Sequence, residues 1–142
     1  MDYQELMNKA ADAREFAYAP YSHFKVGAAL LSKNGRVFTG CNIENASFSP
    51  TVCAERTAFF KAVSEGVKEF AAIAIVGGKE GEIAPSCAPC GVCRQVMAEF
   101  CDQDFVVVLG TPDNFKTYEF GEILPLSFSK SDLKDNAETQ SV

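Results

Sequence analysis

The sequence predicts an α/β fold, in which helices cover both faces of a mixed, five-stranded sheet as a three-layer α/β/α arrangement. Helical and strand patterns alternate along the chain in the order α-β-β-α-β-α-β-β, which favours such layers. Two of the strand segments are almost entirely apolar, as is typical of strands buried on both faces. With 142 residues, 47% of them hydrophobic, the chain should form a single domain over residues 1–142.

The first third of the chain predicts a helix followed by a β-hairpin. Residues 2–18 carry apolar side chains at spacings of three and four, which is typical of an amphipathic helix. Residues 24–31 and 37–43 are predicted strands. Between them lies Asn34-Gly35, a pair that readily supplies the positive φ angles of a tight turn. The two strands should therefore pair in an antiparallel hairpin.

The remainder predicts two helices that alternate with three strands. Ser49-Pro50 combines a helix N-cap with a proline at the first helical position, which predicts a helix over residues 50–65. The apolar run over residues 70–76 predicts a buried strand. The later patterns predict a helix over 89–101, strands over 105–109 and 117–120, and a mobile polar tail over 129–142.

Charge and hydropathy narrow the set of partners. The net charge is −6 and no run of basic residues occurs, so we expect no nucleic-acid partner. No signal peptide is evident, and no apolar stretch approaches the roughly 18 residues that span a bilayer, so we expect no membrane partner and a cytoplasmic location. The six cysteines should then be reduced thiols, although a disulfide framework is the alternative.

Three of these cysteines have the pattern of a metal site. The two-residue gap between Cys90 and Cys93 lets both sulfurs reach one zinc ion. Cys53 supplies a third sulfur if the two helix starts face each other across the sheet. Each motif lies near a predicted helix N-terminus, where free N–H groups and the helix dipole stabilise thiolates.

The number of ligands decides what kind of site this is. Structural zinc sites are closed by four ligands, whereas three leave a position for water, and the metal then lowers the pKa of that water toward about 7. Glu55, two residues after Cys53, is expected to carry protons rather than to bind the metal. Arg56 and Arg94 would offset the negative charge of three thiolates, with Arg56 hydrogen-bonded to a ligand sulfur.

Two other interpretations of the cysteines remain open. Cys87 could close a structural site as a fourth ligand, since Cys87, Cys90 and Cys93 are evenly spaced. Alternatively, Cys90 and Cys93 could form a redox pair. Neither alternative gives Glu55 a role.

These motifs resemble a known family. Cys-Ala-Glu at 53–55 followed by Pro-Cys-x-x-Cys at 89–93 resembles the zinc-dependent nucleoside deaminases, and specifically the small cytidine deaminases with three cysteine ligands. The resemblance spans residues 18–128. It includes the segments Tyr18-Ala-Pro-Tyr-Ser-His-Phe-Lys-Val-Gly-Ala-Ala-Leu, Gly40-Cys-Asn-Ile-Glu-Asn-Ala, Cys53-Ala-Glu-Arg-Thr-Ala and Leu124-Pro-Leu-Ser-Phe128.

The resemblance implies a cytidine-deaminase-like fold and an activity. Cytidine and deoxycytidine, as free nucleosides, would be hydrolysed at C4 to uridine and deoxyuridine plus ammonia, a step of pyrimidine salvage. One zinc would be bound per subunit by Cys53, Cys90 and Cys93. Glu55 would protonate ring N3 and then pass a proton to the departing ammonia.

The resemblance also implies the residues that hold the substrate. Asn42 and Glu44 match a ribose-binding pair, and Phe24 matches the residue that packs against the base. Ala54 would present backbone groups to the edge of the base. Family members of this size are homotetramers, which implies that Phe128 reaches into the site of a neighbouring subunit.

The sequence departs from the family pattern at two places, and related functions stay possible. Phe48 stands where many members carry Tyr, and Cys87-Ala88 precedes Pro89, which places an additional thiol near the metal. The alternatives are a deaminase of a cytosine-containing nucleoside antibiotic, whose zinc chemistry would be the same, and a non-catalytic structural zinc module. Asn42 and Glu44 favour a ribose-bearing substrate.

Overall fold

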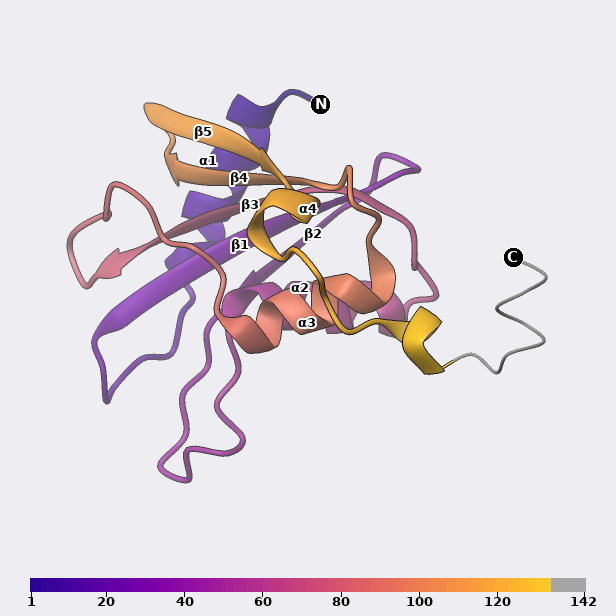
Figure 1. Cartoon of the computed structure of the whole chain (residues 1–142). Coiled ribbons are helices and arrows are strands. Elements are labelled where there is room, and N and C mark those ends of the chain that lie inside the picture. The colour runs from indigo at the N-terminus through magenta and orange to yellow at the C-terminus, as the bar shows by residue number, and fades with distance from the viewer. Residues whose placement is uncertain (134–142) are drawn as a thin grey trace.

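The fold is known from a computed structural model, which describes residues 1–133. Five strands form one sheet in the order β2-β1-β3-β4-β5 (Figure 1). Among the strand pairs of this sheet within residues 1–133, β3–β4 alone is parallel, so the predicted mixed five-stranded sheet is confirmed. The elements are α1 (Tyr3–Arg14), β1 (Phe24–Ser32), β2 (Val37–Cys41), α2 (Ala54–Ser64), β3 (Phe70–Lys79), α3 (Gly91–Phe100), β4 (Val106–Thr111), β5 (Asn114–Glu119), α4 (Phe120–Ile123) and the 3-10 helix η1 (Lys130–Leu133).

Helices cover both faces of the sheet, as predicted. Helix α1 lies on one face, and α2 and α3 lie next to each other on the opposite face (Figure 1). The alternation of side chains along β3 supplies both cores: Ala74 and Val76 pack with α1, while Ile73 and Ile75 pack with α2 and α3. Strand β3 is therefore buried on both sides, which accounts for its continuous apolar sequence.

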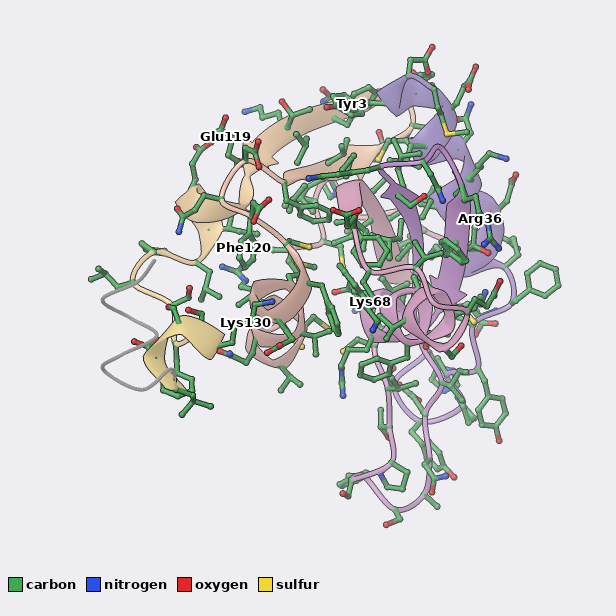
Figure 2. All side chains as sticks on the ribbon, turned by 90° about the vertical axis from the view of Figure 1, so that its right-hand side faces the viewer. Tyr3, Arg36, Lys68, Glu119, Phe120 and Lys130 are labelled. Carbon is green, nitrogen blue, oxygen red and sulfur yellow. The ribbon has the colours of Figure 1, made fainter. Side chains whose placement is uncertain are left out.

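The first two strands form the predicted hairpin. Leu31 pairs with Val37 and Leu30 with Phe38. Gly35 has φ of +91°, a conformation that glycine adopts without steric strain and that the Asn-Gly pair predicts. Figure 2 shows Arg36 of this hairpin and Glu119 of β5 on opposite sides of the molecule, as expected of the two sheet edges.

Both helix boundaries nearest the candidate substrate residues differ from the prediction. Helix α1 ends at Arg14 rather than at residue 18, because Tyr18 leaves the helix to form a bridge with Ile43. Helix α2 begins at Ala54 rather than at Pro50, because Val52 pairs with Ile43 and keeps the chain extended up to Cys53. Ser49-Pro50 therefore lies in a turn of the β2–α2 loop, which projects from the rest of the molecule with its side chains in solvent (Figure 2).

The end of the chain also differs in detail. Strand β5 covers residues 114–119 instead of 117–120, because the turn is short: the Asn114 amide donates to the Thr111 hydroxyl at 3.0 Å. Of the predicted tail, residues 130–133 form η1, and residues 134–142 lie outside the described part. Within residues 1–133, none of the helices has both the length and the hydropathy that a bilayer-spanning segment needs.

One glycine fixes where α2 begins relative to the sheet. A Cβ atom on Gly40 of β2 would lie 2.6 Å from the backbone nitrogen of Ala58 and would also overlap the carbonyl oxygen of Ala54. Only glycine permits this close approach between strand and helix. The first turn of α2, which carries Glu55, is thus held against the edge of the sheet.

Candidate active site

The three predicted metal ligands come from the starts of two neighbouring helices. Cys53 is the N-cap residue of α2, Cys90 is the N-cap residue of α3, and Cys93 lies in the first turn of α3. The sequence makes Cys53 a ligand on the condition that the two helix starts face each other across the sheet. They lie instead on the same face of the sheet, because both helices pack over the one core that includes Cys93 and Ala54.

The sulfur geometry fits one zinc ion. The Sγ atoms of Cys53 and Cys90 are 3.6 Å apart, and so are those of Cys90 and Cys93. All three atoms lie within 4.8 Å of one another. Tetrahedral ligands at the usual zinc–sulfur distance of about 2.3 Å would be separated by roughly 3.8 Å, which matches these spacings. Within residues 1–133 this metal-binding group has three members, as the catalytic interpretation requires.

Hydrogen bonds favour the thiolate form of Cys53. Interactions with Cys93, and with the Arg56 guanidinium whose Nη2 lies 3.4 Å from Cys53 Sγ, lower the pKa of Cys53 to about 5. The same contact with Cys53 raises the pKa of Cys93. A thiolate is the form in which cysteine binds a metal, so these contacts favour Cys53 as a ligand.

Cys87 stands apart from this group. Its sulfur packs against β3, where a Cβ atom on Gly77 would lie only 2.6 Å from it. Burial raises the pKa of the Cys87 thiol to about 11, so it is neutral at physiological pH. The structure places Cys87 beside the site but gives no support to a closed site with four thiolates.

Glu55 has the environment of a proton carrier. It is the second residue of α2 and is only 4% exposed. Burial, with a further contribution from the negative charge of Cys53, raises the pKa of Glu55 to about 7. A carboxyl group with such a pKa can both accept and release a proton near neutral pH, which is what general acid–base catalysis needs.

The two arginines have different contacts. Arg56 contacts the sulfur of Cys53, as described above. Arg94 donates from Nε to the carbonyl of Pro89 at 2.8 Å and from Nη1 to the carbonyl of Ile123 at 2.5 Å. Arg94 therefore ties the loop before Cys90 to the end of α4, and its compensation of the thiolate charge stays a prediction.

The side chain of Asn42 extends the edge of strand β1. Its Oδ1 accepts a hydrogen bond from the Val26 amide, and its Nδ2 donates to the Phe24 carbonyl, both at 2.8 Å. Phe24 and Val26 are two residues apart on β1 and so face the same side of the sheet. Val26 packs against the same core as Cys53 and Cys87, which puts Phe24 on the face that carries the metal site.

Glu44 is held by a turn rather than by a charged partner. Its Oε1 accepts from the backbone amides of Tyr21 at 2.9 Å and Ser22 at 3.1 Å, and its Oε2 accepts from the Ser22 hydroxyl. The hydrogen bonds from Ser22 lower the pKa of Glu44, so the group is a carboxylate at neutral pH. A surface pocket of about 380 Å³ adjoins it, lined by Tyr21, Ser22, Glu44, Asn45, Phe48 and Thr51.

The other predicted residues differ in exposure. Ala54, between Cys53 and Glu55, is fully buried. Phe128 is 59% exposed, and its carbonyl accepts a hydrogen bond from Gln95 Nε2 at 2.8 Å. Phe48 is 82% exposed at the rim of the surface pocket.

Sequence reasoning missed the residues that hold Glu44. Tyr21 and Ser22 lie inside the segment 18–30 that carries the family resemblance, but they have no charge and no metal-binding group. Their position shortly before Phe24, which the family resemblance implies as the base-packing residue, is the available signal, because residues near such a position are candidates for shaping the same site.

A family match, similar sequences and a similar solved structure all relate this chain to cytidine deaminases. Residues 1–109 match the family described as the cytidine and deoxycytidylate deaminase zinc-binding region. The chain is 50% identical to a cytidine deaminase of Sporosarcina psychrophila over 97% of this chain and 99% of the relative. It is also 50% identical to a cytidine deaminase of Halalkalibacterium halodurans, over 95% of this chain and 100% of the relative. The crystal structure of cytidine deaminase from Burkholderia pseudomallei has a TM-score of 0.82 and 49% identity, and the alignment covers 90% of this chain and 100% of that one. The chain belongs to the cytidine deaminase family.

Proposed function

We propose that this protein is a zinc-dependent hydrolase that converts cytidine and deoxycytidine into uridine and deoxyuridine, with release of ammonia. The observation that carries the proposal is a buried carboxyl group, Glu55, two residues after one of three cysteines whose sulfurs are spaced for one zinc ion. The similarity to named cytidine deaminases over nearly the whole chain supports the same reaction.

The reaction requires proton transfers that Glu55 is suited to perform. When bound by Cys53, Cys90 and Cys93, zinc supplies a Lewis acid that makes a water molecule acidic enough to ionise near neutral pH. Glu55 accepts a proton from the attacking water and delivers it to ring N3, which makes C4 electrophilic. After the C4–O bond forms, Glu55 carries the second proton of that water to the amino nitrogen. The C4–N bond then breaks and ammonia leaves.

The substrate is held at two ends in this proposal. Glu44 accepts a hydrogen bond from a sugar hydroxyl, and the carboxylate charge strengthens that bond. Asn42 acts beside it, although two of its hydrogen-bonding positions are used by β1, so its contribution is limited to the remaining N–H and lone pair. Phe24 packs against the base, and the backbone of Ala54 contacts the edge of the base.

We also propose that the enzyme is a cytoplasmic homotetramer that acts on free nucleosides in pyrimidine salvage, with residues 1–142 as one domain. Several large apolar side chains are exposed on the single chain, among them Phe16, Leu126 and Phe128, and contact with other subunits would bury such groups. Phe128 would enter the site of a neighbour. Sedimentation equilibrium of the zinc-loaded protein tests the tetramer, and a monomer at micromolar concentration would contradict it.

One assay tests the reaction and separates the alternatives. Zinc-loaded protein is incubated with cytidine, deoxycytidine or a cytosine-containing nucleoside antibiotic, and the ultraviolet absorbance and the products are followed. We expect loss of cytidine with equal amounts of uridine and ammonia. Turnover of the antibiotic alone would favour the antibiotic deaminase, and no turnover of any substrate by protein that holds one zinc would favour a structural zinc module.

A further inference from the structure

The hydroxyl group of Ser22 links the two regions proposed to hold the sugar and the base. It donates a hydrogen bond to Oε2 of Glu44 and accepts one from the backbone amide of Phe24 at 3.0 Å. Glu44 lies 22 residues further along the chain, whereas Phe24 is the first residue of β1. A single side chain therefore joins the proposed sugar-binding carboxylate to the strand that carries the proposed base-packing ring.

The backbone turns sharply next to Ser22, and hydrogen bonds define the turn. His23, between Ser22 and Phe24, has φ of +58°, in the left-handed region that residues with a Cβ rarely adopt. The hydrogen bond from the Phe24 amide to the Ser22 hydroxyl closes the turn around His23, and the His23 amide donates to the Ala19 carbonyl at 3.0 Å. Such a conformation persists only where its surroundings define it fully.

Counting acceptor positions shows what Glu44 has left for a ligand. A carboxylate has about four lone-pair positions, two on each oxygen. The amides of Tyr21 and Ser22 occupy both positions on Oε1. The Ser22 hydroxyl occupies one position on Oε2. One acceptor position therefore remains, on Oε2, and its direction is set by the Ser22 hydroxyl that takes the other.

We propose that Ser22 is a positioning residue that fixes the free acceptor of Glu44 relative to Phe24, and so sets the distance between sugar and base that the site accepts. This inference rests on the proposed function, because it concerns the nucleoside bound there. Ser22 acts on binding through Glu44. It does not contact the reacting atoms, which lie at the metal and Glu55.

The test is a double-mutant cycle with cytidine and zinc-loaded protein. Ser22→Ala should raise KM about three- to tenfold, as expected for loss of a hydrogen bond to a charged group, with kcat changed less than about twofold. Ser22→Thr keeps the hydroxyl and should restore most of the affinity. In a Glu44→Gln background, Ser22→Ala should raise KM less than about twofold further, since the effect passes through the carboxylate. Ser64→Ala removes an exposed hydroxyl that donates to the Lys61 carbonyl at 2.7 Å and should leave both constants unchanged.

Each contrary result has a definite meaning. If Ser22→Ala leaves KM unchanged, or raises it equally in both backgrounds, Ser22 does not act through Glu44. If kcat falls as much as KM rises, or if Ser22→Thr is no better than Ser22→Ala, the residue has a general structural role and the inference fails. Wild-type protein that holds zinc but does not turn over cytidine would overturn the proposed function, and this inference with it. Active wild-type protein with an unaffected Ser22→Ala variant overturns the inference alone.

Discussion

Nη2 of Arg56 lies 3.4 Å from Sγ of Cys53, one turn further along helix α2. The guanidinium is thus a cation in direct contact with one of the three sulfurs, and Arg56 directly follows Glu55 in the sequence. Three thiolates with one divalent ion carry an excess negative charge, which this contact reduces.

Replacing Arg56 by Gln should lower kcat/KM about tenfold and move the acid limb of the pH–rate profile to higher pH. Loss of a nearby positive charge makes ionisation of a neighbouring carboxyl group harder, so its pKa rises. Steady-state rates with cytidine across the pH range measure both effects, and Arg56→Lys, which keeps the charge, should show smaller ones. An unchanged pH profile for Arg56→Gln would contradict the proposed role.

Glu55→Gln should keep one zinc per chain but lose about 10²–10⁴-fold in kcat, because an amide cannot carry the protons of the reaction. Zinc content is measured after gel filtration, and kcat with saturating cytidine. Near-normal turnover would show that another group transfers the protons. Loss of zinc would show that Glu55 also supports the metal.

The roles of the cysteines can be distinguished by the zinc content of protein variants that lack one of them. Cys53→Ala should lose both the metal and activity, because it removes one of three ligands from the group. Cys87→Ala is the matched control, since that thiol packs against Gly77 and should be dispensable for both. If Cys87→Ala lost the metal, the closed four-thiolate site would have to be reconsidered.

Gly40→Ala should destabilise the protein by about 1–3 kcal/mol, as is usual for an added methyl group in a tightly packed interior. The new Cβ would push the first turn of α2 away from β2, and activity should fall with stability. Denaturant unfolding measures the stability of the variant, and cytidine turnover measures its activity. Gly121→Ala is the control, because its Cβ would meet the movable end of the Gln103 side chain. Equal stability of the two variants would argue against close packing at Gly40.

Arg14→Met should cost about 2–4 kcal/mol of unfolding free energy, because the buried guanidinium donates to several backbone carbonyls that would be left without it. It is 6% exposed and donates to Lys25, Gly78, Lys79 and Glu82. Arg36→Ala, which removes an exposed ion pair with Glu65 at 2.8 Å, should change stability by less than about 1 kcal/mol. Similar losses in the two variants would contradict the role given to Arg14.

The features predicted well from the sequence are those specified locally. The Asn34-Gly35 turn depends on the φ angles of its own residues, and the apolar run of β3 reports burial directly. The cysteine motifs are equally local, since Cys90 and Cys93 are three residues apart on one helix. Only their meeting with Cys53 needed the three-dimensional fold.

The features missed depend on contacts between distant segments. Ser49-Pro50 has a good helix-start signal, but the bridge between Ile43 and Val52 keeps the chain extended past it. The hydrogen bonds from Ser22 to Glu44 join residues that no periodic pattern relates. Helix propensity depends on the residues of one segment alone. Here the pairing of Ile43 with Val52 across the loop prevents a helix from starting at Ser49-Pro50.

Cys53 and Cys90 occupy N-cap positions, and within the described chain neither side chain accepts a capping hydrogen bond from a backbone amide of its own helix. Serine or aspartate at an N-cap position contributes about 1 kcal/mol to stability, and helices α2 and α3 lack this contribution. A cation bound by both sulfurs would tie the two helix ends together in its place. Folding and metal uptake are then linked equilibria, and the abundance of intact enzyme in a cell should follow the supply of zinc as well as the rate of synthesis.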